Sequence, residues 1–530
     1  MRSILIIFAA CLMGAARGAS IVYLNESGVT DLSDGTAWDG GVVPGADDVA
    51  VFDGTLPSTL TIPANAAWLG LVRTNIANAV TFDGGPLTLG TDGVTSFTDN
   101  NTLYRTYLPS VVLAGAQTWT LAKDKTLCVN GSVTGTGPLT VTASGSYSVL
   151  FYGDVEPTGG ILARESARVW AMRDSHFAQA PDMAANTMFE FIPDGTGTVA
   201  FADMIDTRTF ANKGIFSFGQ EDTASSFAAA DSPTVTLAAG DSIRGTSTSN
   251  SNRGIQQIRV QDTHVVSDGA DVTVNSWFYL RSGSWTQLSG DTAFNYAALI
   301  GRGSPESCKS KLQRLTLSGG TFTARRMSVG LANNDSYPAE VFVTGGSYAS
   351  TLPNDATWAA ALTVGQRVAS GEEVWDNNQN KMVPMENAFS SARFEMTGGT
   401  VTTPTVFFGN HYDIKKIKDV NTASRFALRG GTLCLGANGI RPAAYWDSNS
   451  ESHYDCVLSG GTFTFYKAGA DSQADMRLSD RDGGTSFCTS NNVPNTRISG
   501  SLFGSGKFRK TGPGTLRLTG PNDYTNRTDV

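Results

Sequence analysis

A pair of glycines recurs five times in the same local context in the second half of the chain. Each pair lies between two short stretches of alternating apolar and polar residues, as in LTLSGGTFT and CVLSGGTFT. The pairs are Gly319-Gly320, Gly345-Gly346, Gly398-Gly399, Gly430-Gly431 and Gly460-Gly461. Successive pairs begin 26, 53, 32 and 30 residues apart. A period near 30 residues is typical of proteins built from stacked repeats. The interval of 53 predicts either one degenerate repeat or an inserted loop.

Apolar residues keep fixed distances from the first glycine of each pair. Four residues before it stand Leu315, Val341, Phe394, Phe426 and Cys456. Two residues before it stand Leu317, Val343, Met396, Leu428 and Leu458. Three residues after it stand Phe322, Tyr348, Val401, Leu433 and Phe463. A spacing of two predicts a β-strand with these side chains on one face. The step across the glycines is odd, so the pair must absorb a change of register as a bulge or a corner.

One such unit cannot bury its apolar row alone, but a stack of units can. The repeat therefore predicts an all-β solenoid in which backbone groups pair between neighbouring units. Strand-like alternation also occurs earlier, for example in PTVTL at residues 233–237. The best helical candidate, residues 178–191, has only weak support from its pattern.

Composition excludes several other classes of protein. Glycine is frequent, with 58 in 530 residues, but it has no triplet period, which excludes collagen. Hydrophobic residues make up 40% and charged residues 16%, which argues against disorder of the whole chain. A net charge of −9 disfavours nucleic acid as a partner. The length favours several domains or a repeat over one ordinary core.

The first residues have the pattern of a signal peptide. Arg2 precedes the apolar run ILIIFAACLMGAA, and small residues follow it. We expect residues 1–18 to be removed on export. The run is too short to span a membrane as a helix, and no later stretch is expected to do so.

Five cysteines lie beyond the expected signal peptide, and they are scattered along the chain. They are Cys128, Cys308, Cys434, Cys456 and Cys488. Their odd number and the lack of a CxxC pair predict neither a disulfide scaffold nor a zinc site. The repeat places Cys456 inside and Cys434 outside, so a disulfide between these two is disfavoured.

The last 27 residues, GSGKFRKTGPGTLRLTGPNDYTNRTDV, carry a second, more specific pattern. It resembles the strand repeat associated with the passengers of bacterial autotransporters. The matching positions are Gly504, Gly506, Phe508, Lys510, Gly512, Gly514, Thr515, Leu516, Leu518, Gly520, Asn522, Tyr524, Thr525, Thr528 and Val530. The resemblance implies a right-handed parallel β-helix passenger, secreted or exposed at the bacterial cell surface. It leaves two alternatives open: a fragment of a longer chain with a membrane barrel, or another export route.

Residues 34–54 are similar to the N-terminal opening common in such proteins. Trp38 is expected to cover an open end of the core, and Pro44 to start a turn. Asp47 and Asp48 are either calcium ligands or part of a solvated turn, and we favour the turn. The expected organisation is an N-terminal β cap with early rungs (19–105), rungs (106–310), Gly-Gly rungs (311–500) and the terminal repeat, cut short or complete (501–530).

Residues with catalytic chemistry do not form a convincing site in the sequence. The densest acidic stretch holds Asp471, Asp475, Asp480 and Asp482, without the order of a calcium loop, and loop solvation is expected. The histidines share no ligand spacing; they are His176, His264, His411 and His453. The short basic patches at Arg325-Arg326 and at residues 415–418 (KKIK) are expected to protect exposed strand edges. We therefore name no catalytic, cofactor or metal-binding residue.

The sequence predicts a structural or adhesive passenger that presents loops to cells, polymers or glycans. The nine Trp and 14 Tyr offer surfaces for stacking on sugars if they are exposed. The alternative is a β-helix enzyme acting on carbohydrates, either a polysaccharide lyase or a glycoside hydrolase. No cofactor is expected, and the oligomeric state stays open.

Overall fold

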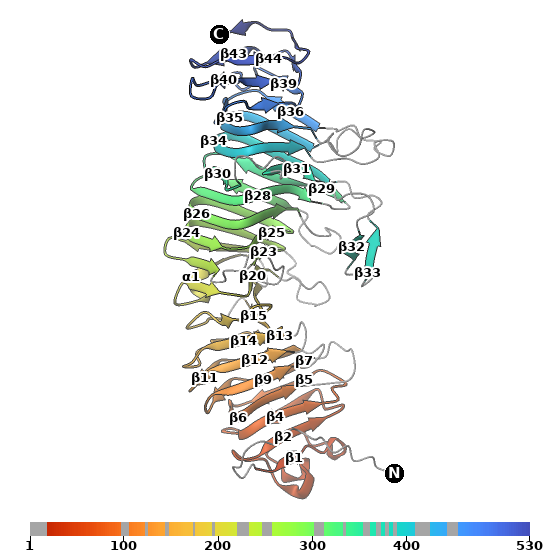
Figure 1. Ribbon diagram of the computed structural model, residues 1–530. Helices are drawn as coiled ribbons and strands as arrows, with labels where there is room; N and C mark the ends of the chain where they lie inside the picture. Colours follow the sequence, from red (N-terminus) through yellow and green to blue (C-terminus); the bar gives the residue numbers. More distant parts are fainter. Residues whose placement is uncertain are drawn as a thin grey trace. The chain divides into compact units, whose positions relative to one another are not determined.

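The computed structural model describes residues 18–96, 105–121, 126–143, 148–172, 175–192, 197–219, 233–245, 257–301, 312–331, 335–352, 361–366, 373–376, 381–384, 390–408, 424–442 and 454–530. These residues are nearly all β-structure (Figure 1). The chain divides into two compact units, Met1–Arg168 and Val169–Val530. Each unit is built on parallel sheets.

The first unit contains two parallel sheets and three short 3-10 helices. One sheet holds β1 (Ser20–Val22), β2 (Val49–Asp53), β4 (Ala67–Thr74), β6 (Leu87–Ser96), β8 (Val111–Leu113), β9 (Gln117–Leu121), β11 (Val133–Gly135), β12 (Leu139–Ala143) and β14 (Ile161–Glu165). The other holds β3 (Thr59–Ile62), β5 (Val80–Gly84), β7 (Arg105–Leu108), β10 (Thr126–Val129) and β13 (Ser148–Phe151). The 3-10 helices are η1 (Asn25–Ser27), η2 (Gly35–Ala37) and η3 (Asp39–Gly41).

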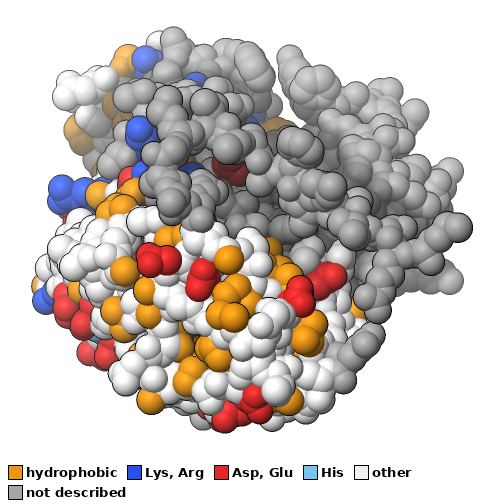
Figure 2. Space-filling view, turned by 90° about the horizontal axis from the view of Figure 1, so that it is seen from below, with side chains coloured by type: hydrophobic (Ala, Val, Ile, Leu, Met, Phe, Trp, Pro, Cys, Tyr) orange, Lys and Arg blue, Asp and Glu red, His pale blue; other side chains and the backbone are white. Residues whose placement is uncertain are grey.

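Trp38 is buried at the start of this unit, as the sequence predicts. Its indole Nε1 donates to the carbonyl oxygen of Leu32 at 3.0 Å. Its ring packs against Tyr23, Phe52 and Trp68, with ring centroids 5.5 to 6.3 Å away. Seen from below, the described surface mixes acidic side chains with separated apolar ones (Figure 2). Trp38, Phe52 and Trp68 are themselves buried in the core of this unit.

In the second unit the strands form three parallel rows, and a typical repeat contributes one strand to each row. Before the glycine-pair region, the strands are β15 (Arg168–Met172), β16 (Asp182–Met183), β17 (Met188–Ile192), β18 (Thr198–Ala200), β19 (Thr209–Asn212), β20 (Ile215–Phe218), β21 (Thr234–Ala238), β22 (Ser242–Gly245), β23 (Gln257–Val260), β24 (Thr263–Val274), β25 (Trp277–Leu280) and β26 (Gly283–Ile300). The glycine-pair region holds β27 (Gln313–Leu317), β28 (Thr321–Leu331), β29 (Asp335–Val343), β30 (Ser347–Ser350), β31 (Leu362–Gln366), β34 (Ser390–Phe408), β35 (Ser424–Arg441), β36 (Tyr454–Leu458) and β37 (Thr462–Phe465). The last strands are β38 (Asp471–Ser472), β39 (Met476–Leu478), β40 (Ser486–Cys488), β41 (Thr496–Ile498), β42 (Leu502–Gly504), β43 (Phe508–Thr511), β44 (Leu516–Leu518), β45 (Asp523–Tyr524) and β46 (Thr528–Asp529).

We number the rows by their order within a repeat. Row 1 includes β27, β29 and β36 with the first parts of β34 and β35. Row 2 includes the first part of β28, β30 and β37 with the middle parts of β34 and β35. Row 3 includes β20, β23, β25 and β31 with the last parts of β26, β28, β34 and β35. The long strands β26, β34 and β35 therefore pass through all three rows.

The fifteen apolar positions predicted from the glycine pairs are all buried. They also stack directly on one another. In row 1, Leu317 pairs with Val343, then Met396, Leu428 and Leu458 in successive repeats. In row 2, Phe322, Tyr348, Val401, Leu433 and Phe463 form the corresponding column. The predicted interior and its register are confirmed.

Each glycine pair makes the corner between rows 1 and 2, and the two glycines have different roles. The second has positive φ at Gly320, Gly399, Gly431 and Gly461, between 65° and 75°; Gly346 is the exception. The first glycine of each pair has an ordinary φ, but its surroundings leave no room for a side chain. A Cβ on Gly430, for example, would lie 2.2 Å from the carbonyl oxygen of Thr397 in the repeat below. The predicted register change lies at this corner, where the pairing of β34 with β35 shifts on both sides of Thr397.

The long interval between the second and third glycine pairs is an insertion rather than a degenerate repeat. β29 pairs directly with β34, with Val341 opposite Phe394. Between them lie β31, which belongs to row 3, and an antiparallel hairpin of β32 (Glu373–Asp376) and β33 (Lys381–Pro384). The hairpin forms its own two-stranded sheet, drawn apart from the rows in Figure 1.

The weak helix prediction for residues 178–191 is wrong. This segment contains β16 and most of β17, where all five side chains from Met188 to Ile192 are buried. A strand buried on both faces has no period-two pattern, and its continuous apolar run resembles a helix in the sequence. The α-helix of the described residues, α1 (Phe201–Met204), is a single short turn.

The terminal residues that resemble the autotransporter strand repeat continue the same stack. β42 pairs with β39 below and β45 above, and β43 pairs with β40 and β46. β44 extends a separate row with β41 and β38. Phe508 stacks on Phe487 with ring centroids 4.9 Å apart, so the motif adds to the same interior.

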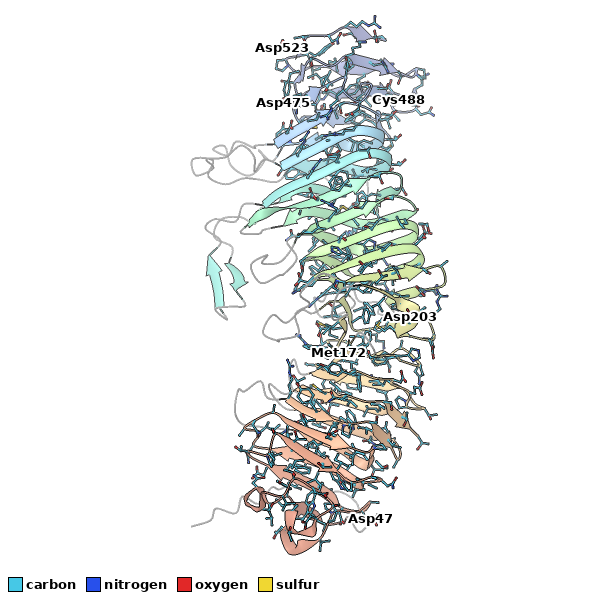
Figure 3. The ribbon with its side chains drawn as sticks, turned by 180° about the vertical axis from the view of Figure 1, so that it is seen from behind. Asp47, Met172, Asp203, Asp475, Cys488 and Asp523 are labelled. Carbon is cyan, nitrogen blue, oxygen red and sulfur yellow. The ribbon has the colours of Figure 1, made fainter. Side chains whose placement is uncertain are left out.

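The cysteines of the described residues are free, and the predicted sides are confirmed for two of them. Cys456 is buried and Cys434 is half-buried on the outer side. Cys128 is also buried, and Cys488 is half-buried among the last repeats (Figure 3). Cys308 lies outside the described residues.

Thiol alkylation at pH 8 is expected to separate these cysteines by rate. Burial raises the pKa of the Cys128 thiol to about 12, and it also raises the pKa of Cys456. A raised pKa keeps these thiols protonated at pH 8, and the thiolate is the reactive form. In the folded protein Cys488 should react first, while Cys128 and Cys456 should react only after denaturation. Peptide mass spectrometry after timed alkylation measures this, and equal rates at Cys456 and Cys488 would contradict the interior assigned to Cys456.

Candidate functional site

An aromatic cluster lies on the outer face of row 3, where Trp277 and Tyr296 are half-buried and pack against the buried Tyr279. In β25, Phe278 and Leu280 point into the core and are fully buried. Their neighbours Trp277 and Tyr279 therefore point outward, because successive side chains on a strand alternate in direction. β23 and the last part of β26 pair with β25 on its two sides, which holds these side chains on a rigid support.

The cluster is a continuous stack of rings and guanidinium groups. The rings of Trp277 and Tyr279 are nearly parallel, with centroids 5.6 Å apart. Tyr296 lies against Trp277 at 4.4 Å. The guanidinium of Arg326 lies over both Tyr296 and Trp277, at 5.0 and 5.6 Å, and Arg259 lies over Tyr279 at 6.0 Å. Cation–π contacts of this kind fix the orientation of the rings.

Among the tryptophans whose side chains the structure describes, Trp277 has the accessible indole. Five others are buried in the core: Trp38, Trp68, Trp119, Trp170 and Trp285. The side chains of Trp358, Trp375 and Trp446 lie outside the described residues. The sequence could not separate these groups, because both inward and outward positions accept large aromatic residues. Trp277 and Tyr296 are therefore the residues that sequence reasoning missed.

The predicted role of Arg325 and Arg326 at a strand edge is wrong. Both lie within β28, which pairs with β26 on one side and with β30 and β31 on the other. Arg326 packs over aromatic rings of the preceding repeats in the same row, and Arg325 is exposed to solvent. The basic residues at 415–418 lie outside the described residues.

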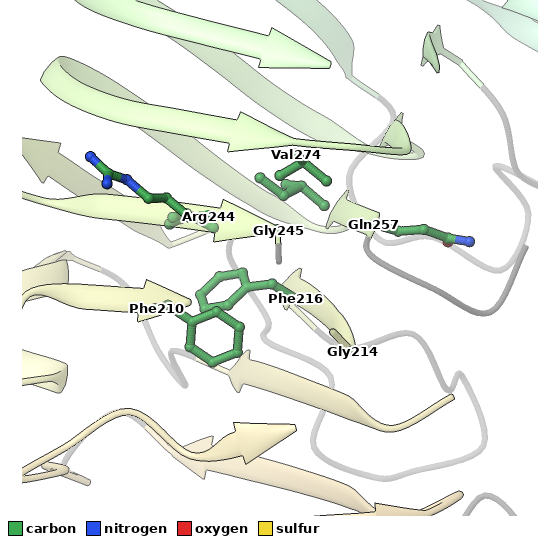
Figure 4. A pocket seen from close by; sticks show the side chains of 9 residues that line it. Phe210, Gly214, Phe216, Arg244, Gly245, Gln257 and Val274 are labelled. Carbon is green, nitrogen blue, oxygen red and sulfur yellow. The ribbon is translucent and has the colours of Figure 1, made fainter. Parts of the chain in front are cut away.

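A small crevice lies between rows 2 and 3 next to Phe210 and Phe216 (Figure 4). Gln257, Arg244 and Val274 also line it, and its interior volume is about 10 Å³. A space of this size holds roughly one water molecule. It is too small to receive a sugar, so the surface cluster is the better candidate for recognition.

The acidic stretch at residues 471–482 connects repeats instead of being solvated throughout. Asp471 is buried, accepts hydrogen bonds from the Ser499 hydroxyl at 2.9 and 3.1 Å, and pairs with Arg497 at 3.0 Å. Asp475 accepts from the backbone N–H of Ser501 at 2.7 Å (Figure 3). Asp480 accepts from the backbone N–H of Lys507 at 2.9 Å. These carboxylates bind the following repeat.

The remaining titratable candidates have local partners. Asp48 accepts from the backbone N–H groups of Ala19 and Gly45, each at 3.0 Å, which is a turn-stabilising role. His176 contacts Asp206 at 2.8 Å and His264 contacts the Ser284 hydroxyl at 2.8 Å, and burial lowers the pKa of His264. His411 and His453 lie outside the described residues. Within the part of the chain that is described, no group of three or more His, Cys, Asp or Glu could hold a metal ion.

Among the described residues, no helix has the length and apolar character needed to cross a membrane. The sequence is 27% identical over 224 residues to the adhesin BmaC autotransporter of Brucella suis biovar 1 (strain 1330). The match covers 41% of this chain and 6% of that protein, so the chain spans only a small part of its relative. No protein-family model and no solved structure matches the chain. The parallel β-structure and this partial similarity agree, at a coarse level, with an autotransporter-like surface passenger.

Proposed function

We propose that the chain is a right-handed β-solenoid passenger, secreted or displayed at a bacterial cell surface, that acts as an adhesive module without catalysis. Three rows of parallel strands with one strand per row in a repeat support the solenoid, and such parallel crossovers are right-handed in nearly all proteins. The partial similarity to an autotransporter adhesin supports the location and the adhesive role.

The aromatic cluster of Trp277, Tyr279, Tyr296, Arg259 and Arg326 is the observation that carries the proposal. The half-buried indole of Trp277, held by Tyr279, Tyr296 and Arg326, has an exposed apolar part that could contact the C–H groups of a sugar ring. Because the cluster lies on paired strands, its geometry is set before a ligand arrives, which reduces the entropy lost on binding. We assign a neutral glycan to this site.

The substitution Trp277→Ala is expected to weaken glycan binding at least tenfold, which corresponds to about 1.4 kcal/mol. The loss of the stacking surface is the reason, and Trp277→Phe should restore part of the affinity. Titration of the purified chain against a panel of neutral oligosaccharides, followed by tryptophan fluorescence and calorimetry, measures this.

Phe503→Ala is the matched control, because Phe503 is an exposed aromatic residue on β42, outside the cluster. It should leave the affinity unchanged. Equal binding by the wild type and Trp277→Ala would refute the assigned site. Release of reducing or unsaturated ends from polyuronides by the wild-type protein would refute the non-catalytic proposal and favour a β-helix enzyme.

A further inference from the structure

A second cluster of charged side chains lies on the outer face of row 1, where arginines form ion pairs with carboxylates of neighbouring strands. The Arg314 guanidinium donates two hydrogen bonds to Glu340 Oε2, at 2.9 Å from Nε and 2.6 Å from Nη2. Arg393 lies between Glu340, at 3.7 Å, and Glu395, to which it donates from Nε at 3.0 Å. Arg429 completes the series with Nε 3.1 Å from Glu395. Four successive strands of row 1, β27, β29, β34 and β35, supply these residues.

The next strands extend the same pattern with a second group. Asp455 on β36 lies between Arg425, at 3.6 Å, and Arg477 on β39, at 3.0 Å. Arg393, Arg425 and Asp455 occupy one register column in consecutive strands. We call the five arginines of the two groups the arginine strip: Arg314, Arg393, Arg425, Arg429 and Arg477.

Two of the three carboxylates of the strip, those of Glu340 and Glu395, are buried, whereas Asp455 is about as exposed as the guanidinium groups. Glu340 and Glu395 are only 8% and 6% exposed, whereas the arginine side chains are between 22% and 41% exposed. Five arginines stand against three acids, so the strip has a net charge of +2 in a chain with a net charge of −9. The strip is therefore a local cationic surface.

Packing orders the guanidinium groups. Phe342 lies between Arg314 and Arg393, and each guanidinium carbon is 5.1 Å from the centre of its ring. Strands of a sheet are about 4.8 Å apart, so the arginines of β27, β34, β35 and β39 are separated by one or two such steps along the stacking direction. A guanidinium has five N–H groups, and Arg477 contacts both oxygens of Asp455 through Nη2, so its fork offers further donors.

We propose that the arginine strip binds a linear polysaccharide that carries a carboxylate on each sugar, a polyuronate. Arginine recognises carboxylates with two parallel hydrogen bonds, and the arginines of the strip already bind three side-chain carboxylates, those of Glu340, Glu395 and Asp455. A polymer that lies along the stacking direction meets several guanidinium groups in turn, and its affinity grows by multivalency. This site is separate from the Trp277 cluster and does not depend on it.

The double variant Arg425→Gln, Arg477→Gln tests the proposal. Its carboxylate partner Asp455 is 36% exposed and stays hydrated, so the fold should be retained, which circular dichroism and thermal unfolding check. The variant should bind polygalacturonate at least tenfold more weakly than the wild type by calorimetry at low salt. Its affinity should also depend less steeply on salt concentration, because fewer charge contacts are made.

Arg244→Gln is the matched control, since Arg244 is an exposed arginine paired with Asp271 at 2.6 Å on row 2. It should bind polygalacturonate as the wild type does, and so should Trp277→Ala, which separates this proposal from the neutral-glycan site. Fully methyl-esterified polygalacturonate, which lacks the carboxylates, should not bind. Unchanged binding by the double variant would overturn the proposal. Dextran sulfate or DNA binding as tightly as polygalacturonate would also overturn it, because the strip would then be a general polyanion surface.

Discussion

Gly431→Ala is expected to destabilise the second unit by roughly 2–5 kcal/mol. Gly431 has φ of 75°, and an L-residue in this region costs about 1–2 kcal/mol. In addition, a Cβ at this position would lie 2.5 Å from the carbonyl carbon and oxygen of Gly398 in the stacked repeat. Forcing extra atoms into such a packed position costs typically about 1–3 kcal/mol. The two contributions arise from different atoms, so they should add.

Gly469→Ala separates the two contributions. Gly469 has φ of 70°, yet an added Cβ there has no atom within 4 Å. It should therefore show the conformational cost of about 1–2 kcal/mol alone. Urea unfolding of both variants, followed by circular dichroism, measures the difference. If Gly431→Ala unfolds at the same urea concentration as Gly469→Ala, the close stacking of the glycine corners is contradicted.

Leu428→Asp is expected to destabilise the second unit more than Gly431→Ala does. It should also unfold the repeats on both sides of β35. Leu428 is fully buried between Met396 below and Leu458 above. Removal of a buried leucine side chain alone costs about 2–5 kcal/mol. A carboxylate in its place would be buried without a partner, which adds a further desolvation cost. Because each repeat is stabilised by its neighbours, the loss should spread to β34 and β36.

Limited proteolysis with mass spectrometry locates this effect, and new cleavage sites should concentrate around residues 390–465. Thr432→Asp is the matched control, because Thr432 lies on the outer side of the same strand, β35. It should leave the cleavage pattern unchanged. Equal sensitivity of the two variants would mean that the column through Leu428 is not the interior.

Some features of the fold follow from local pattern. Period-two alternation around each glycine pair identifies the inward residues of rows 1 and 2, since a strand has only two faces and the core takes the apolar one. Row 3 has a weaker signal. Its outward residues in β17 and β25 include buried ones, such as Glu190 and Tyr279, so the alternation that marks a half-exposed strand is lost. The wrong helix prediction at residues 178–191 has the same cause.

The composition of the two candidate sites depends on how the repeats stack, more than the inward residues of rows 1 and 2 do. Trp277 and Trp285 are eight residues apart and both lie in strand-like patterns, yet one is partly exposed and the other is buried. The arginine strip joins residues from Arg314 to Arg477. Arg314, Arg393 and Arg425 each lie five residues before the first glycine of a pair, whereas Arg429 and Arg477 do not share that position. Arg314, Arg393 and Arg425 share one register column, because the chain returns to the same column after intervals of different length.

The sequence by itself determined the repeating strand–corner–strand unit and its inward side chains, because glycine conformation and apolar alternation act within a few residues. Only the tertiary structure decided the three rows, the insertion between β29 and β34, and the two surface clusters. Contacts between repeats create these features, and the number of residues between two stacked positions does not affect the distance between them in space.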